Sequence, residues 1–368
     1  MLEEHFHLIA DSTRCGQFKT AIQKVIKSDD LVADLGCGSG ILGLFCLQAG
    51  AALVYEVDSG SILEIAKETL ARAGLGSQAV FIRGKASQIE LPQRVDLVVC
   101  DHIGCFGFDY GIIGLLQDAR SRFLKPEGVL VPARLNLQLS LVESERCASV
   151  VQGWATSQIP AEYHWLAEHE KHTKHLVNLK SEELLSEPGL LGCINLYENT
   201  PDYFSWSVDL ITEREGVMHG LGGWCETCLA EGVWVSNSPL TEKSIKRSQV
   251  FLPVGEPVPV KSGEHVKATI MTRPADNLIA WVVELPTTGQ RFKHSTWQTL
   301  LTDTDFIRAA PNHIPRLKPE GHARITIMSY CDGRRTFHEV EQAILRDHPH
   351  LLPSSEEISR FVAEVLGR

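Results

Sequence analysis

The chain has 368 residues, of which 43% are hydrophobic, so it can bury a large core and is not globally disordered. Its formal net charge of −11 argues against a general nucleic-acid binder, which needs a basic face, and suits a cationic substrate. The ten cysteines are scattered through apolar runs, and the N-terminus resembles no signal peptide. No stretch of about 18 apolar residues is present, so we expect no membrane span. These features predict a cytoplasmic protein with two domains and a small third piece.

The first thirty residues contain three polar side chains of interest, His5, Asp11 and Arg14. An amphipathic helix is predicted directly after them, over residues 16–26. Taken alone, Asp11 and Arg14 read equally well as charges at the start of that helix.

A glycine-rich turn over residues 31–50 is the feature around which the rest is organised. A short apolar strand at 32–35 leads into Gly36, Gly38 and Gly40, and a helix is predicted over 41–48. Glycines at such a turn let backbone N–H groups approach a ligand, because no Cβ stands in the way.

Two cofactors compete for this turn. Gly38-x-Gly40-x-x-Gly43 matches the dinucleotide fingerprint, and Asp58 lies about 20 residues further on. Asp34 argues against NAD, because a pyrophosphate would lie beside its carboxylate. S-adenosylmethionine (SAM) has no phosphate, and its ammonium and sulfonium attract an acid. We therefore predict SAM rather than NAD, with an ordinary glycine turn that binds no ligand as the remaining alternative.

Strands and helices alternate from residue 31 to residue 141, which predicts a doubly wound parallel sheet. Further strands are predicted at 53–58, 79–82, 95–100 and 129–131, helices at 61–75 and 110–122, and a turn at 124–128. Ligands of such sheets bind at the carboxyl ends of the strands. Those ends carry Asp34–Gly40, Asp58 with Ser59, Lys85, Ala86 and Ser87, and Asp101. The sequence thus converges on one crevice.

Beyond Pro132 the pattern changes to short alternating strands, which predicts an antiparallel sandwich or barrel. The expected strands are 137–141, 203–208, 229–235 and 278–285. Residues 150–185 are polar and rich in histidine, but the spacing fits no zinc pattern, so we expect solvated helix or loop and no metal. Cys225 and Cys228 are expected to be buried strand cysteines.

The last residues predict a compact strand–helix–helix appendage. The strand is expected at 324–329, and Thr336-Phe-His-Glu339 is a capping box that opens a helix to about residue 346. A second helix is expected to begin at Ser354. Through Asp332-Gly-Arg-Arg-Thr336 the appendage is similar to small winged-helix peptide-binding modules, although an interaction module or a cap packed on the barrel fits equally well.

Residues 5–300 resemble the protein arginine methyltransferase family. The resemblance rests on an N-terminal signature, a SAM loop, two later motifs and two short matches in the predicted barrel. These are His5-x-x-Leu-Ile-x-Asp11-x-x-Arg14, Asp34-Leu-Gly-Cys-Gly-Ser-Gly-Ile-Leu, Gly84-Lys-x-x-x-Ile-Glu-Leu-Pro92, Leu124-Lys-Pro-Glu-Gly-Val-Leu-Val-Pro132, Val235-Ser-Asn-Ser-Pro239 and Ser248-Gln-Val-Phe251.

The resemblance implies a class I methyltransferase in which Arg14 pairs with the SAM carboxylate. It also implies that Asp58 binds the ribose hydroxyls and that the backbone near Ala86 binds adenine. The expected cofactor site comprises His5, Arg14, Asp34, Gly36, Gly38, Gly40, Asp58, Ser59, Lys85, Ala86, Ser87 and Asp101. A homodimer formed through an arm at 150–185 is implied as well.

The sequence departs from the family on the acceptor side. The family's loop with two glutamates has Asp101 at the first position and Tyr110 at the second, with Asp109 one residue early. The family's Thr-His-Trp loop is Ser244-Ile245-Lys246, and Ser87 stands where the family has an adenine-contacting acid. Two carboxylates would normally align a guanidinium, which is a poor nucleophile.

These departures favour a non-standard nitrogen acceptor: a guanidine, a free amino acid or a peptide. The expected catalytic residue is Asp101, with Asp109 or His102 taking a supporting proton. Lys246 is placed to bind a substrate carboxylate. The alternative is a catalytically silent SAM-binding partner subunit.

We expect a SAM-binding Rossmann-like domain over residues 1–132 and an antiparallel β-barrel-like substrate domain over residues 133–310. A winged-helix-like, α-rich appendage is expected over 320–368.

Overall fold

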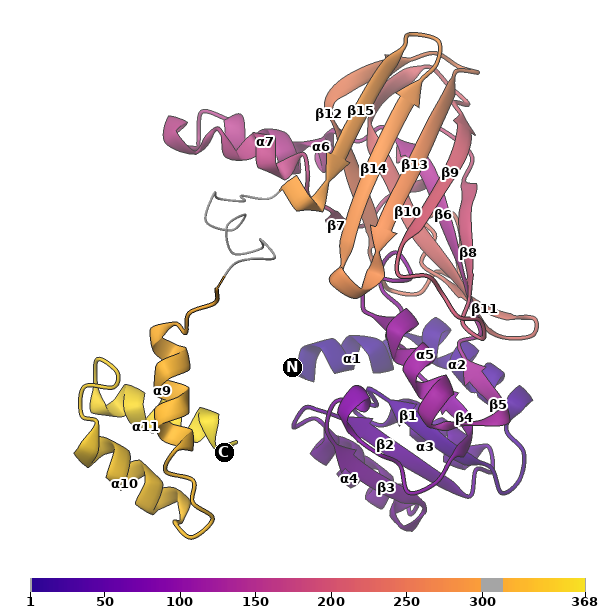
Figure 1. The fold of residues 1–368 in the computed structure, drawn as a ribbon. Helices are drawn as coiled ribbons and strands as arrows, with labels where there is room; N and C mark the ends of the chain where they lie inside the picture. The colour runs from indigo at the N-terminus through magenta and orange to yellow at the C-terminus, as the bar shows by residue number, and fades with distance from the viewer. Residues whose placement is uncertain (1, 299–313, 368) are drawn as a thin grey trace. The chain divides into compact units, whose positions relative to one another are not determined.

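The computed structural model describes residues 2–298 and 314–367 and divides the chain into two compact units, residues 1–300 and 301–368 (Figure 1). Within the described residues, no helix is both long enough and apolar enough to cross a membrane. The first unit contains a parallel sheet followed by an antiparallel β domain.

Five parallel strands in the order β3-β2-β1-β4-β5 form the first sheet, which confirms the predicted Rossmann-like fold. The strands are β1 (Leu31–Leu35), β2 (Leu53–Asp58), β3 (Ala79–Arg83), β4 (Val95–Val99) and β5 (Leu124–Val131), with the helices α1 (Leu2–Ala10), α2 (Ser12–Val25), α3 (Ile41–Gln48), α4 (Leu63–Arg72) and α5 (Ile112–Arg122). The central strands β1 and β4 are almost wholly buried, as expected for parallel strands covered on both faces.

Two local expectations differ from the structure. Helix α2 begins four residues earlier than predicted, because the Asp11 carboxylate caps it by accepting from the Arg14 N–H at 3.0 Å. The segment 124–128, expected as a turn, belongs to β5, whose pairing with β4 shifts register between Val95 and Leu97. Its Pro and Gly residues occupy this irregularity.

The β domain consists of two antiparallel sheets, which confirms the antiparallel β structure predicted beyond Pro132. One has the order β7-β12-β10-β6-β8 with β11 paired to β10, and the other has the order β15-β14-β13-β9. The strands are β6 (Arg134–Val142), β7 (His175–Val177), β8 (Gly189–Asn195), β9 (Phe204–Ile211), β10 (Gly216–Ala230), β11 (Val233–Ser236), β12 (Gln249–Val260), β13 (His265–Arg273), β14 (Leu278–Leu285) and β15 (Gln290–Ser295).

The prediction of one strand over 229–235 is wrong. This segment is a hairpin in which β10 ends at Ala230 and β11 begins at Val233. Gly232 at the turn has φ +73°, which glycine adopts without the cost that a side chain would bring. Cys225 and Cys228 lie buried on β10 as expected.

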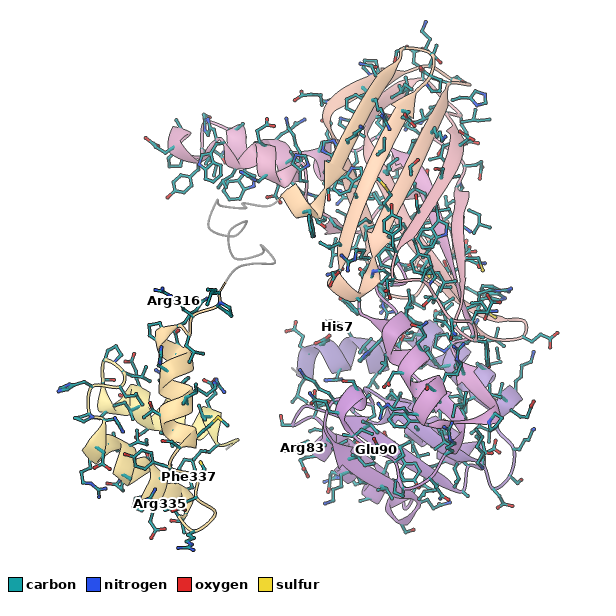
Figure 2. The ribbon with its side chains drawn as sticks, viewed as in Figure 1. His7, Arg83, Glu90, Arg316, Arg335 and Phe337 are labelled. Atoms are coloured by element: carbon teal, nitrogen blue, oxygen red, sulfur yellow. The ribbon has the colours of Figure 1, made fainter. Side chains whose placement is uncertain are left out.

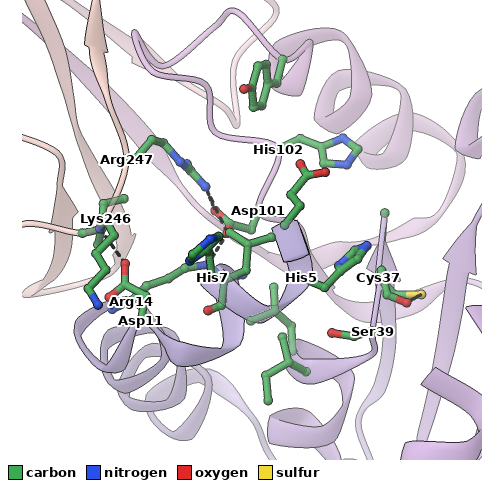
Figure 3. A pocket seen from close by; sticks show the side chains of 18 of the residues that line it. His5, His7, Asp11, Arg14, Cys37, Ser39, Asp101, His102, Lys246 and Arg247 are labelled. Carbon is green, nitrogen blue, oxygen red and sulfur yellow. Dashed lines mark hydrogen bonds and ion pairs between the residues drawn. The ribbon is translucent and has the colours of Figure 1, made fainter. Parts of the chain in front are cut away.

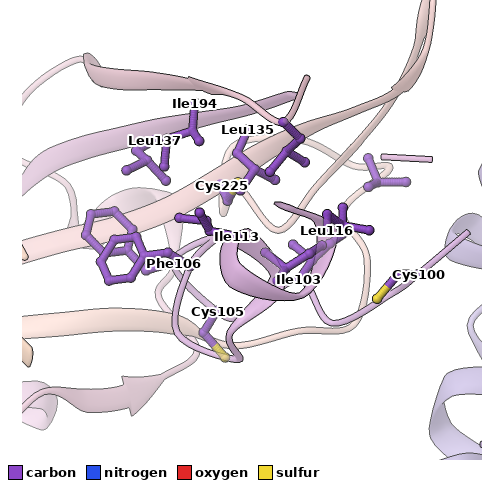
Figure 4. Packing of buried hydrophobic residues seen from close by; sticks show 14 of the residues in the cluster. Cys100, Ile103, Cys105, Phe106, Ile113, Leu116, Leu135, Leu137, Ile194 and Cys225 are labelled. Atoms are coloured by element: carbon purple, nitrogen blue, oxygen red, sulfur yellow. The ribbon is translucent and has the colours of Figure 1, made fainter. Parts of the chain in front are cut away.

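The parallel sheet and the β domain share one hydrophobic core, and the loop after β4 contributes to it (Figure 4). Phe106 and Phe108 of this loop are fully buried. A Cβ on Gly223 of β10 would lie 2.7 Å from Cε2 of Phe106, so the ring packs directly on the strand backbone. The loop that carries Asp101 is therefore anchored in both halves of the unit.

Residues 150–185 form an arm with helical and short extended pieces. Helix α6 (Glu145–Gln152) leads into it, and the arm contains α7 (Leu166–Glu170) and β7. This agrees with the expectation of helix or loop except at β7, which pairs with β12. Tyr163 and Trp165 of the arm are 53% and 49% exposed.

The second unit, as described over residues 314–367, has three helices packed around a small core of Ile327, Val340, Ile344, Ile358 and Val362. These helices are α9 (Pro319–Met328), α10 (Phe337–Asp347) and α11 (Ser355–Val365). The capping box at Thr336 and Glu339 is confirmed. In the turn before it, the Arg335 guanidinium lies 5.3 Å from the centre of the Tyr330 ring. Figure 2 labels Arg335 beside Phe337, the first residue of α10.

The predicted strand at 324–329 is wrong, because these residues lie in α9 or directly follow it. The β-branched run Ile325-Thr326-Ile327 suggested a strand, but the buried residues are Ala323 and Ile327, four apart. Pro319 opens the helix at its first position, where a missing N–H costs nothing.

Candidate active site

Two adjoining cavities lie at the carboxyl ends of the parallel strands, with volumes of about 570 and 470 Å³. They share Gly36, Asp58, His102 and Tyr110 as lining residues, so they form one continuous crevice. Figure 3 shows the first cavity, with Asp101 near its centre and the side chains of His5, His7 and Arg14 around it.

The floor of the first cavity is the glycine turn between β1 and α3. Gly36 and Gly38 have φ values of +70° and +55°, in the left-handed region. A Cβ on Gly36 would lie 2.3 Å from Nε2 of His102, and one on Gly38 would lie 2.7 Å from Cε1 of His5. Only glycine fits at these positions, and the chain thereby brings two predicted site histidines against the backbone.

The second cavity contains the remaining residues predicted for the adenosine side: Ser59, Lys85, Ala86 and Ser87. The Asp58 carboxylate at its edge accepts hydrogen bonds from the N–H groups of Gly38 and Gly60, at 3.0 and 2.7 Å. Arg122 of α5 donates to the carbonyl of Ala86 at 2.6 Å and so fixes this loop.

Asp34 lies beneath the floor and lines neither cavity. Its carboxylate is 1% exposed and accepts from the Gly43 N–H at 2.9 Å. Burial, opposed by the Gly43 hydrogen bond, raises the pKa of Asp34 to about 7. Glu56 of β2 is fully buried nearby, and burial together with the charge of Asp34 holds the pKa of Glu56 well above its usual range. Asp34 can thus act on a ligand only through long-range electrostatics and not by direct contact.

The buried Asp34 carboxyl predicts that the protein becomes less stable as the pH rises through about 7. The folded state holds this proton far above the pKa of about 3.9 in the unfolded chain, so unfolding releases it. The stabilisation is complete below about pH 4 and is lost through about pH 7. Urea unfolding across this range measures it. Glu56→Gln, which removes one of the two coupled acids, should flatten the slope, and an unchanged slope in that variant would contradict the assignment.

Asp101 sits where the parallel sheet meets the β domain, between two arginines (Figure 3). Its carboxylate is 2.5 Å from Nε of Arg14 and 3.4 Å from the nearest Arg247 nitrogen. Arg247 also donates to the carbonyl of Ile103, which sets its orientation. The side chain of Asp101 is 9% exposed, so this is a nearly buried charge cluster.

Asp11 ties the N-terminal helices to the β domain. One carboxylate oxygen caps α2, and the other accepts from the backbone N–H of Lys246 at 2.7 Å. Helix α1 covers the first cavity with Glu4, His5 and His7, although none of its residues is buried.

Besides Asp34, two further predicted site residues, Asp109 and Gly40, line neither cavity. The side chain of Asp109 is 1% exposed, accepts from the Phe106 N–H at 2.9 Å and pairs with Lys174 at 3.1 Å. Gly40 ends the glycine turn at φ +79° as the cap of α3. We therefore assign Asp109 to positioning of the loop rather than to proton transfer.

Among the charged residues that line the first cavity, Glu4 and Arg247 were not singled out from the sequence. Arg247 could have been found as the second member of a basic pair with Lys246. Glu4 carried no signal, since acids in a first helical turn are common. In the described part of the chain, no group of three His, Cys, Asp or Glu side chains is arranged to hold a metal.

Comparisons of sequence find similarity to methyltransferases. Residues 18–171 match the family model for ribosomal protein L11 methyltransferase (PrmA). Protein arginine N-methyltransferase 1 of Schizosaccharomyces pombe is 26% identical over 285 residues, covering 74% of this chain and 82% of that protein. Arginine N(omega)-methyltransferase of Streptomyces achromogenes subsp. streptozoticus is 27% identical over 266 residues, covering 71% and 73%.

Solved structures show the same fold. A Trypanosoma brucei PRMT1 enzyme–prozyme heterotetrameric complex with AdoHcy matches with a TM-score of 0.73 at 18% identity, covering 80% of this chain and 98% of that chain. Arabidopsis thaliana protein arginine methyltransferase 10 matches with a TM-score of 0.68 at 17% identity, covering 80% and 98%. At these identities the likeness concerns the fold.

Proposed function

We propose that this chain, a class I SAM-dependent methyltransferase with the fold of the protein arginine methyltransferases, transfers a methyl group to a guanidine or amine nitrogen of an arginine-type acceptor. The observation that carries the proposal is the position of Asp101. This carboxylate lies at the junction of the glycine-floored crevice and the β domain, where an acceptor nitrogen could meet a cofactor.

The residues of the crevice fit SAM. The glycine floor leaves backbone N–H groups near the ligand, and the Asp58 carboxylate retains lone pairs for ribose hydroxyls beyond its two backbone donors. Arg14 would hold the cofactor's carboxylate, because its guanidinium lines the first cavity and its backbone is fixed by Asp11. Lys85, Ala86 and Ser87 would border the adenine in the second cavity.

SAM supplies, when bound, an electrophilic methyl group on a sulfonium sulfur. The N–CH₃ bond that forms replaces an N–H bond of the acceptor, so one proton must leave the nitrogen while the sulfur keeps the S–CH₃ electron pair. Asp101 would hold the acceptor nitrogen and orient its lone pair, and Arg247 and Arg14 fix the carboxylate for that task. His102, which lines both cavities, is placed to pass the proton toward solvent.

Labelled SAM incubated with a panel of amines and guanidines, arginine included, tests the proposal. Labelled arginine-type product is expected. Absence of any methylated product, with S-adenosylhomocysteine still bound, would instead support a silent SAM-binding subunit. Tyr110 at the position of the family's second glutamate is the observation that favours this second candidate.

We further propose that the protein forms a homodimer through the arm at 150–185, because Tyr163 and Trp165 expose large apolar surfaces there. Trp165→Glu is expected to halve the mass in sedimentation, since a buried interface charge without a partner is costly. Tyr203→Glu, at a ring that is 50% exposed outside the arm, should leave the dimer intact. A single mass shared by the wild type and both variants would exclude the arm.

The remaining expectations stay proposals. A reduced, cytoplasmic location is supported by ten cysteines that are all free of disulfides. The domain limit at 132/133 and a peptide-binding role for the last unit are likewise proposed. The expected limit at residue 310 lies outside the described residues.

A further inference from the structure

One loop of the β domain separates the methyl-transfer crevice from another hollow. Ile245, Lys246 and Arg247 line the first cavity on one side and a hollow of about 480 Å³ on the other. This hollow lies between residues 178–179 and 238–249, so it belongs to the β domain. An acceptor whose nitrogen lies at Asp101 would therefore extend along or across this loop.

The chemistry of the hollow suits an anion. Its lining contains no Asp or Glu, although the chain as a whole is acidic. Its polar residues are two amides, four hydroxyl residues and two cations: Asn178, Gln249, Ser238, Thr241, Ser244, Ser248, Lys246 and Arg247. A concave surface that offers hydrogen-bond donors and positive charge but no carboxylate attracts an anionic group.

The side chains of Arg247 and Lys246 differ in the hydrogen-bond and ion-pair partners that they already have. Arg247 donates to the carbonyl of Ile103 and pairs with Asp101, so its charge is largely matched. The backbone N–H of Lys246 donates to Asp11 at 2.7 Å, and the other oxygen of that carboxylate accepts from the Arg14 N–H. Lys246 is therefore an exposed lysine with a fixed backbone, and its ammonium has no ion-pair partner among the described residues.

The acids that line the first cavity are Glu4, Asp11, Asp58 and Asp101. Asp101 is the acid nearest the junction, and it is already bridged by two arginines. Tyr110 is 57% exposed and neutral, and it lines both cavities. A ligand with one positive end and one negative end would match Asp101 and Lys246 together. A purely cationic ligand would be repelled by the Lys246 ammonium.

We propose that Lys246 binds an α-carboxylate of the methyl acceptor, so that the acceptor is a free amino acid of the arginine type and not an arginine within a peptide chain. The inference rests on the proposed function. A free amino acid and the C-terminal residue of a peptide share this carboxylate, and the ligands chosen below separate them.

Four ligands test the proposal by initial rates with saturating SAM. Arginine carries the carboxylate, argininamide lacks it, Nα-benzoylarginine mimics a C-terminal residue, and Nα-acetylargininamide mimics an interior residue. We expect a KM for arginine at least tenfold below that for argininamide, with a similar kcat, because binding rather than the chemical step is changed. Much weaker methylation of Nα-benzoylarginine than of arginine would identify the free amino acid as the substrate. Equal methylation of the two ligands would overturn the choice of a free amino acid over a C-terminal residue.

Lys246→Gln should raise the KM for arginine at least tenfold and leave that for argininamide unchanged. Lys243→Gln is the matched control, because Lys243 is an exposed lysine three residues earlier that lines none of these cavities. Equal KM values for arginine and argininamide in the wild type, or equal effects of the two variants, would overturn the proposal.

Calorimetric binding of the same ligands to the protein saturated with S-adenosylhomocysteine separates this inference from the proposed function. If no ligand is methylated, the proposed function fails. Tighter binding of arginine than of argininamide, abolished by Lys246→Gln, would still support the carboxylate site, and equal binding would reject it.

Discussion

Asp101→Asn should lower kcat for methyl transfer by about 10²- to 10³-fold and change the affinity for S-adenosylhomocysteine by less than about threefold. Asparagine keeps the shape of the side chain and one oxygen for Arg14, so the crevice should survive. It cannot hold a cationic acceptor or share its proton, because it carries no charge. Radiolabel transfer measures kcat, and calorimetry measures the affinity.

Asp109→Asn is the matched control, since Asp109 lies in the same loop and outside the crevice. Its kcat should stay within about threefold of the wild type, whereas stability should fall by roughly 3 kcal/mol because Lys174 loses its partner at a nearly buried site. Equal losses of kcat in the two variants would contradict the separation of a catalytic and a positioning acid.

Gly36→Ala should weaken binding of S-adenosylhomocysteine by about 100-fold or more, equivalent to about 2.7 kcal/mol. The new Cβ would lie 2.3 Å from Nε2 of His102, so this ring, which lines both cavities, must leave its position. The backbone at φ +70° adds strain of about 1–2 kcal/mol for a residue with a side chain. Calorimetry on the folded variant measures the loss.

Gly74→Ala separates these two causes. Gly74 has φ +74°, almost the value of Gly36, but a Cβ there would meet no atom within 4 Å. The variant should lose about 1–2 kcal/mol of stability and bind S-adenosylhomocysteine normally. Comparable loss of binding in both variants would show that strain, and not the contact with His102, disturbs the site.

The part of the site that could be predicted from the sequence is the part encoded by short, contiguous patterns. An apolar strand followed by glycines fixes a turn at one end of a parallel sheet, so Gly36, Asp58 and Asp101 could be placed together before the structure was known. Tyr110 and Lys246 were recognised through motif positions, and both line the first cavity.

The rest depends on tertiary packing. Asp109 is as acidic as Asp101 in the sequence, but the burial of Phe106 and Phe108 turns it toward Lys174. Arg247 reaches Asp101 from 146 positions away, which no local pattern reports. Asp34 was expected to face a cation, yet its hydrogen bond to Gly43 holds it under the loop.

Phe106 seated on the backbone of Gly223 also limits how a substrate can enter. The parallel sheet and the β domain cannot separate at Asp101 without exposing their common core, so the crevice should not open by rotation of one half against the other. Helix α1 covers the first cavity with no buried residue of its own and can move at low cost. The route for loading cofactor and releasing product should therefore run beneath this helix.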